Sequence, residues 1–249
     1  MSDSAGDKPQ QFPMRVGDFL NHADVYLNRG DIILSRNNTL TSQMIRWGTD
    51  GFFSHSALVF LLPQPRNGFD NVFVLESVSE GVGVANFKPW VDGAKAAEQV
   101  AILRLNDKSL HEDYFKHVGG LMLDMVKSTY DFDRVINMGL AFVFGIRLGI
   151  ARLQRKRISL KPWAPKSFIC SGFIQYGLVE AMRRRMGDTG SVVLKPGLDP
   201  NDHQGLLAVS PEDIASSEKV KYLYAIHHGW VHEVKSYAQA RTIISGAQS

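Results

Sequence analysis

Residues 168–176 read Phe168-Ile169-Cys170-Ser171-Gly172-Phe173-Ile174-Gln175-Tyr176 and contain the only cysteine of the chain. The segment before them, 161–166, holds two prolines, which exclude a regular helix there. After Cys170, apolar residues recur at helical spacing as far as Met186. The pattern therefore predicts that Cys170 lies in the first turn of a helix. There, free backbone N–H groups and the helix dipole favour a thiolate.

The composition is typical of a globular protein. The chain has 249 residues, of which 44% are hydrophobic and 21% charged, and its formal net charge is +3. This length predicts one large domain with a substantial core. So small a positive charge gives no reason to expect a nucleic-acid partner. A single cysteine cannot form an intramolecular disulfide, so the fold does not depend on an oxidising compartment.

The N-terminal residues show no secretory signal. Residues 1–13 are polar and lack an apolar core, so we expect a disordered lead followed by a single domain over 14–249. We predict a cytoplasmic protein, either free or peripheral to a membrane. Export by a specialised secretion system is compatible with the same N-terminus.

Short apolar runs joined by tight loops predict an antiparallel sheet. One run opens with His55, and another ends at Glu76. If these two side chains meet at one edge of the sheet, they supply the base that a thiol nucleophile needs and the group that orients this base. The predicted strands cover 32–34, 54–62, 72–76, 81–84, 100–105 and 220–226.

Helical spacing and capping residues predict the remaining elements. Thr39 or Thr41 can cap a helix that ends near Trp47. Ser210 followed by Pro211 is a cap with proline at the first helical position. Further helices are predicted over 16–27, 110–127 and 227–238.

The segment between the sheet and Cys170 is apolar and then basic. Residues 135–151 are mostly apolar but too short and interrupted for a full membrane span. The next residues include six cations and no acid: Arg152, Arg155, Lys156, Arg157, Lys161 and Lys166. An apolar face with a basic rim is typical of an interfacial segment, so we expect 135–166 to contact anionic membrane peripherally.

Several short motifs together resemble a known family. Cys-Ser-Gly-Phe at a helix start is similar to the nucleophile motif of the NlpC/p60 superfamily of papain-like cysteine enzymes. The histidine precedes the cysteine here, an order similar to that of the circularly permuted branch, the YiiX-like proteins and, more distantly, the lecithin:retinol acyltransferase group. The resemblance spans about 30–226. The motifs are Gly30-Asp31-Ile32-Ile33, Ser54-His55-Ser56-Ala57-Leu58-Val59, Val74-Leu75-Glu76-Ser77, Tyr130-Asp131-Phe132, Cys170-Ser171-Gly172-Phe173 and Ser210-Pro211-Glu212-Asp213.

The resemblance implies an α+β, circularly permuted papain-like fold, with an antiparallel sheet packed against the nucleophile helix. It implies acyl transfer in which His55 activates Cys170 and Glu76 orients His55. Tyr130 is a further oxyanion donor beside the backbone N–H of Cys170, and Ser171 lines the site. Two features depart from the family pattern: Gly172, where many YiiX-like members have glutamate, and an apolar and basic insertion at about 133–166.

Three interpretations of the function remain open, two of which differ in the substrate. We prefer a lipid acyl ester, because of the apolar and basic segment and the lipid chemistry of the acyltransferase relatives. An amide, such as a cell-wall peptide, is the second reading. The third is a non-catalytic membrane-binding module in which Cys170 serves only packing, since a lone cysteine is often a small buried hydrophobe. The choice between hydrolase and transferase, the acyl acceptor and the oligomeric state stay undetermined.

Metal, cofactor and nucleic-acid sites are not expected. His228 and His232 are four residues apart with Glu233 alongside, which on a helix would put them on one face. No H-E-x-x-H motif or nearby cysteine completes a zinc site, so we predict no metal. No glycine-rich phosphate loop is present, and the basic stretch 147–166 lacks an aromatic platform for nucleic acid.

Overall fold

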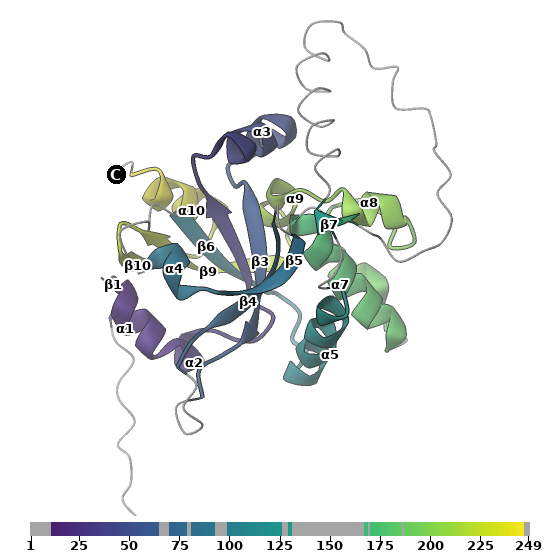
Figure 1. Cartoon of the computed structure of the whole chain (residues 1–249), viewed down its shortest axis with the longest axis horizontal. Helices are drawn as coiled ribbons and strands as arrows, with labels where there is room; N and C mark the ends of the chain where they lie inside the picture. The colour runs from purple at the N-terminus through teal and green to yellow at the C-terminus, as the bar shows by residue number, and fades with distance from the viewer. Residues whose placement is uncertain are drawn as a thin grey trace, which may run out of the picture.

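The computed structural model describes residues 11–64, 70–78, 81–92, 99–125, 129–130, 167–168, 170–185 and 187–246. At its centre is an eight-stranded sheet whose neighbouring strands are all antiparallel (Figure 1). The strand order is β1-β10-β9-β6-β2-β3-β4-β5. The fold class is therefore α+β with an antiparallel sheet, which confirms this part of the prediction.

The elements are mostly short. The strands of the large sheet are β1 (Met14–Arg15), β2 (Ile32–Arg36), β3 (His55–Leu61), β4 (Phe73–Val78), β5 (Gly81–Asn86), β6 (Gln99–Leu105), β9 (Val220–His227) and β10 (Trp230–Glu233). Two further strands, β7 (Thr129–Tyr130) and β8 (Ser167–Phe168), pair in parallel. The helices are α1 (Val16–Asn21), α2 (Ala23–Tyr26), α3 (Leu40–Thr49), α4 (Lys88–Val91), α5 (Glu112–Leu123), α7 (Cys170–Arg184), η3 (Thr189–Val192), α8 (His203–Leu207), α9 (Pro211–Ala215) and α10 (Tyr237–Ile244).

Both faces of the sheet are covered, because its strands alternate apolar side chains between two cores. On β2, Ile32 and Leu34 belong to the core that also contains Phe173 of α7, whereas Ile33 belongs to the core that contains Phe19 of α1. Helix α7 thus packs on one face of the sheet, together with α5. Helices α1 and α2 pack on the other face (Figure 1).

A buried ion pair ties the beginning of β2 to β6. Asp31 is fully buried, and its two carboxylate oxygens accept from Arg104 Nε at 2.6 Å and from an Arg104 Nη at 2.7 Å. The backbone N–H of Asn28 donates to the same carboxylate at 2.7 Å. Bidentate pairing of this kind holds the loop before β2 in one geometry.

Three predicted elements differ from the structure. The helix predicted over 16–27 is two helices, α1 and α2, separated at His22. The helix predicted over 227–238 is wrong, because His228 and Gly229 take positive φ values of 49° and 75° and turn the chain from β9 into β10. The terminal helix, α10, starts only at Tyr237, after a cap by Ser236.

The predicted disordered lead includes one residue that packs on the fold. Phe12, placed in the disordered lead by the sequence, packs on Tyr224 and Tyr26 with ring centroids 5.2 and 5.7 Å apart. Residues 1–10 and the apolar and basic segment at 133–166 lie outside the described residues. Within the residues that the structure does describe, no helix has the length and apolar character needed to cross a membrane.

Candidate active site

Cys170 is the first residue of α7, as the sequence predicts. Twelve residues of this helix are buried, since it packs on the sheet along most of its length. Two arginines, Arg183 and Arg184, lie in its last turn, where cations are favoured. The first-turn position leaves the backbone N–H of Cys170 without a partner inside the helix.

His55 and Glu76 meet on one face of the sheet. β3 pairs with β4 so that Ala57 lies opposite Glu76, and His55 is two residues before Ala57 on the same face. His55 Nε2 and Glu76 Oε2 are 2.7 Å apart. The side chains of both residues are largely buried, with 16% and 12% exposed. The predicted contact between His55 and Glu76 is therefore present.

The other side of the histidine faces the thiol. The His55 side chain is also hydrogen-bonded to Cys170, in addition to its contact with Glu76. The structure thus brings together the three residues that the sequence proposed, from two strands and one helix. Their order along the chain is histidine, glutamate, cysteine.

The contact changes the ionisation of both partners. Burial opposes the charged form of His55, but the adjacent Cys170 and Glu76 outweigh it and raise the pKa of His55 to about 10. Burial likewise opposes the Cys170 thiolate, yet the charge and hydrogen bond of His55 and the backbone of Ser56 lower the pKa of the thiol. Each partner therefore favours the charged form of the other: the imidazolium stabilises the thiolate, and the thiolate stabilises the imidazolium.

Two residues at this site were missed by the sequence reasoning. The backbone N–H and the hydroxyl of Ser56 both face the Cys170 sulfur. Within the described residues, the buried Ser56 Oγ has no nitrogen or oxygen partner. The ring of Trp90 lies 5.4 Å from that of His55 and covers it. Ser56 was within reach of the sequence as the neighbour of His55, but no local signal points to Trp90.

Glu76 occupies a different place from the one predicted. The sequence ended its strand at Glu76, whereas β4 continues to Val78. The side chain is therefore in the middle of a paired strand rather than at a solvated end. Its neighbours Leu75 and Ser77 are completely buried.

Ser171, predicted to line the site, directs its hydroxyl elsewhere. It is fully buried, and its Oγ donates to the carbonyl of Val209 at 2.6 Å. Gln175, one turn further along α7, donates to the carbonyl of Val192 at 3.0 Å and accepts from Leu194 N–H at 2.7 Å. Both side chains fasten the long segment after α7 to the helix.

Gly172 allows this segment to approach α7 closely. A Cβ at Gly172 would lie 2.3 Å from the carbonyl oxygen of Leu207, which is backbone and cannot turn aside. The glycine in the third place of the motif is thus required by the packing of α8. A glutamate would not fit here.

The Ser210-Pro211-Glu212-Asp213 motif positions the loop before His55. Ser210 and Asp213 form a capping box at the start of α9. Glu212 Oε2 accepts from Phe52 N–H at 2.8 Å, and Glu212 Oε1 accepts from Tyr237 OH at 2.6 Å. A motif more than 150 residues away in sequence therefore fixes the approach to β3.

Tyr130 reaches the neighbourhood of the nucleophile through its backbone. β7 pairs with β8 so that Tyr130 lies opposite Phe168, two residues before Cys170. The side chain of Tyr130 is outside what the structure describes, so its role as an oxyanion donor stays a prediction.

The thiol is closed off in this structure. Cys170 is only 1% exposed. Another molecule can therefore reach the sulfur only if neighbouring groups move apart.

Metal ligands are not gathered in the described part of the chain. There, no group of three or more His, Cys, Asp or Glu side chains is placed to hold an ion. His228 lies in the β9–β10 turn and His232 on β10, so the two do not share a helix face.

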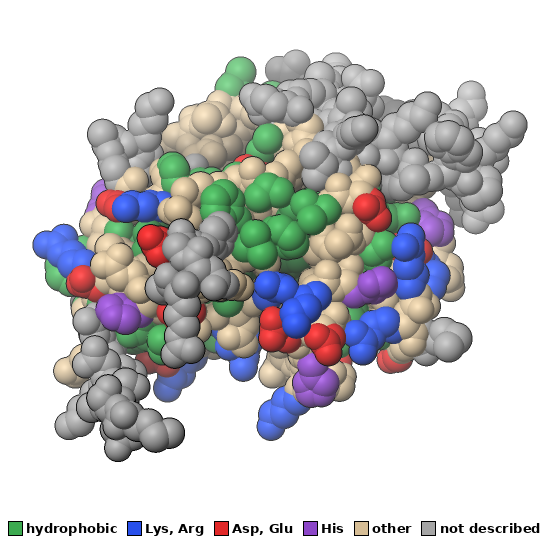
Figure 2. All heavy atoms as spheres, turned by 60° about the horizontal axis from the view of Figure 1, so that its bottom comes forward, with side chains coloured by type: hydrophobic (Ala, Val, Ile, Leu, Met, Phe, Trp, Pro, Cys, Tyr) green, Lys and Arg blue, Asp and Glu red, His purple; other side chains and the backbone are tan. Residues whose placement is uncertain are grey.

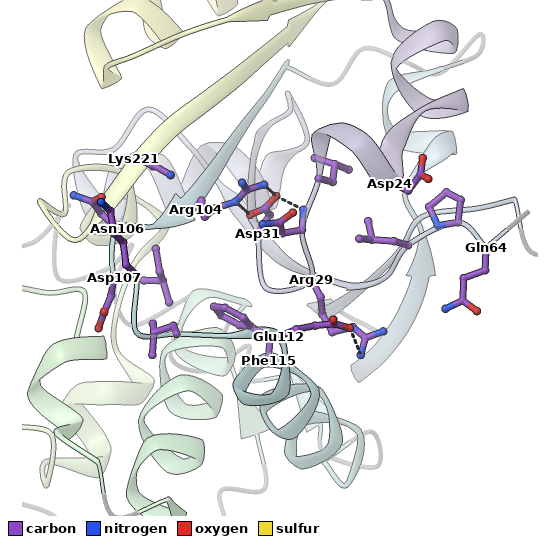
Figure 3. A pocket seen from close by; sticks show the side chains of 17 residues that line it. Asp24, Arg29, Asp31, Gln64, Arg104, Asn106, Asp107, Glu112, Phe115 and Lys221 are labelled. Atoms are coloured by element: carbon purple, nitrogen blue, oxygen red, sulfur yellow. Dashed lines mark hydrogen bonds and ion pairs between the residues drawn. The ribbon is translucent and has the colours of Figure 1, made fainter. Parts of the chain in front are cut away.

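A cavity of about 590 Å³ lies where the loop before β2 meets the ends of β3 and β6 (Figure 3). Its lining includes Asp31, Leu62 and Asn106, together with residues of α5 and β9. Because β3 begins at His55 and ends at Leu61, this cavity is separated from His55 by the length of a strand. It is not the site of the proposed chemistry.

Comparison with known proteins gives a weak likeness to solved structures. No family model matches the sequence, and no curated protein matches it. Among solved structures, the crystal structure of the metalloprotein YiiX from Escherichia coli O157:H7 is similar, with a TM-score of 0.49 and 16% sequence identity. The match covers 80% of this chain and 97% of that chain.

Proposed function

We propose that this protein is a cysteine-dependent hydrolase or acyltransferase that works through an acyl-enzyme on Cys170. The observation that carries the proposal is the unbroken contact from Glu76 to His55 to Cys170. A nucleophile, a base in hydrogen-bond contact with it and a carboxylate on the far side of the base are the parts that acyl transfer requires. We also infer that the fold is a circularly permuted papain-like one, because the histidine and its carboxylate precede the nucleophile helix in the chain.

The reaction has two steps, formation of the acyl-enzyme and its release. The Cys170 thiolate bonds to the carbonyl carbon of the substrate, and the backbone N–H of Cys170 stabilises the oxyanion. The carbon–oxygen bond of the ester breaks, and the imidazolium of His55 gives its proton to the leaving alcohol. In the second step His55 takes a proton from water or another acceptor, which attacks the thioester and restores the thiolate.

The substrate class that we favour is a lipid acyl ester. Its support is the apolar and basic character of residues 135–166 and the resemblance to the lecithin:retinol acyltransferase group. A peptide amide remains the alternative within the same chemistry.

A non-catalytic membrane-binding module is the second candidate. The 1% exposure of Cys170 favours it, because a buried thiol often serves packing alone. It predicts that Cys170→Ala leaves every activity unchanged.

Mass spectrometry of the intact protein separates these candidates. We would incubate it with phospholipid vesicles and, separately, with peptidoglycan fragments, and look for an acyl adduct on Cys170 together with released fatty acid or cleaved peptide. Cys170→Ala is the control for chemistry at the thiol. An adduct formed with lipid supports the proposal. An adduct or cleavage with peptide would make the substrate a peptide amide instead of a lipid ester. If neither substrate gives an adduct, the proposed enzymatic function is overturned.

A further inference from the structure

The outward face of α3 is apolar. Leu40 and Trp47 are 75% and 62% exposed. Met44 lies between them at helical spacing, so the three side chains form one stripe, here called the α3 stripe. Ser42 and Ile45, on the other side of the helix, are buried. A surface helix of a globular protein normally turns its apolar side inward, and α3 has large apolar side chains on its outer side as well.

Three arginines lie at the same end of the sheet as α3 and are here called the arginine cluster: Arg36, Arg46 and Arg241. The guanidinium carbons of Arg36 and Arg241 lie 4.3 and 5.1 Å from the centre of the same Phe52 ring. Arg46 is on α3 itself and donates to the carbonyl of Asn37, the residue after Arg36. Burial lowers the pKa of Arg46, and the nearby charge of Arg36 lowers it further.

The charge of the arginine cluster is not neutralised by ion pairs. Among the residues that the structure describes, none of the three guanidinium groups lies within ion-pair distance of an acid. Glu212 binds the same Phe52, but its two oxygens already accept from Phe52 N–H and Tyr237 OH. Asp50, exposed at the C-terminal cap of α3, is a further acid on this helix. Because no described acid pairs with the three guanidinium groups, they leave the surface attractive to anions.

The stripe and the cluster are at the catalytic end of the sheet. Arg36 follows Ser35, which pairs with His55, and α3 connects β2 to the loop before β3 (Figure 1). By contrast, Figure 2 brings the bottom of Figure 1 forward, and on that face acidic side chains lie next to lysines and arginines. The charges on that face are therefore mixed in sign.

We propose that the α3 stripe and the arginine cluster dock this end of the protein on a bilayer containing anionic phospholipid. Apolar and tryptophan side chains enter the interface, while arginines contact the phosphate groups; this division is typical of interfacial helices. Docking in this orientation presents lipid esters to Cys170. The docking surface stands by itself, whereas its role in supplying substrate rests on the proposed function.

The test uses the full chain carrying Cys170→Ser, so that bound vesicles are not hydrolysed. Sedimentation would be measured with phosphatidylcholine vesicles and with phosphatidylcholine–phosphatidylglycerol vesicles. Removing two large apolar groups with Leu40→Ala and Trp47→Ala together should weaken partitioning about tenfold or more. Arg241→Gln should weaken it about fivefold for the mixed vesicles at low salt, and less as salt is added.

The matched control is Trp230→Ala, which removes an exposed tryptophan on β10 and should leave sedimentation unchanged. Thermal unfolding confirms that each variant is folded. If the double variant sediments like its parent, or if phosphatidylglycerol makes no difference, the docking surface is overturned. If the protein docks through α3 but Cys170 is never acylated, only the proposed enzymatic function is overturned. If Cys170 is acylated but the α3 variants sediment like their parent, only the docking surface is overturned.

Discussion

His55 Nε2 lies 2.7 Å from Glu76 Oε2, and the side chain of the same histidine is hydrogen-bonded to Cys170. One ring thus joins a carboxylate in the middle of a strand to a thiol at the start of a helix. Because the ring interacts with both groups, a change at any of the three residues should alter the ionisation of the other two.

The first prediction concerns the pH dependence of the thiol. The pKa of Cys170 is lowered from 9.0, so its alkylation by iodoacetamide should reach half its maximal rate below pH 9. His55→Gln removes the main cause of this lowering and leaves burial, which acts the other way, so the midpoint should move up to pH 9 or above. Stopped assays of alkylation against pH measure both values.

The fall of enzymatic activity at high pH provides a second test of the His55–Cys170 pair. His55 has its pKa raised to about 10, so the imidazolium persists as pH rises until that value and is lost above it. Turnover needs this proton for the leaving group, and should therefore fall above about pH 10 while alkylation does not. If turnover and alkylation both fell at a pH well below 10, the proposed thiolate–imidazolium pair would be contradicted.

The second prediction concerns Glu76. Glu76→Gln keeps the size of the side chain but removes the charge that stabilises the His55 imidazolium. A hydrogen bond to a charged group contributes about 1.5–3 kcal/mol, so kcat should fall about 10- to 100-fold. Glu112→Gln, at an exposed position on α5, should leave kcat unchanged. Equal activity of Glu76→Gln and wild type would remove Glu76 from the catalytic assignment.

The third prediction concerns Gly172. Gly172→Ala places a Cβ 2.3 Å from Leu207 O, so α8 must move and the free energy of unfolding should fall by about 1–3 kcal/mol or more. Gly120→Ala on α5 meets nothing within 4 Å and should instead raise it by about 0.4–1 kcal/mol. Urea unfolding measures both. Equal stability of the two variants would show that α8 does not press on α7.

The fourth prediction concerns Glu212. Glu212→Ala deprives Phe52 N–H and Tyr237 OH of their acceptor, and each part-buried donor left unsatisfied costs about 1–3 kcal/mol. Glu212→Gln keeps an acceptor and should recover most of the loss. The exposed Glu218→Ala should stay within about 0.5 kcal/mol of wild type. Thermal and urea unfolding check the order of the three.

The sequence determined the parts of this protein that depend on local patterns. Proline before Cys170 and helical spacing after it placed the thiol at a helix start, and α7 begins at Cys170. Alternating and apolar runs predicted the strands, because burial imposes those periods on any sheet. They did not reveal that His228 and Gly229 make a turn, since positive φ at a histidine has no periodic signal.

Only the tertiary structure decided which side chains meet. The register of β3 against β4 sets Glu76 beside His55, and a shift of one residue would have sent Glu76 to the other face. Trp90 and Glu212 reach the site from distant segments, and no spacing in the sequence encodes those contacts. The exposed stripe on α3 is likewise a matter of packing: the pattern shows an apolar side, but only the neighbouring elements decide whether that side is covered.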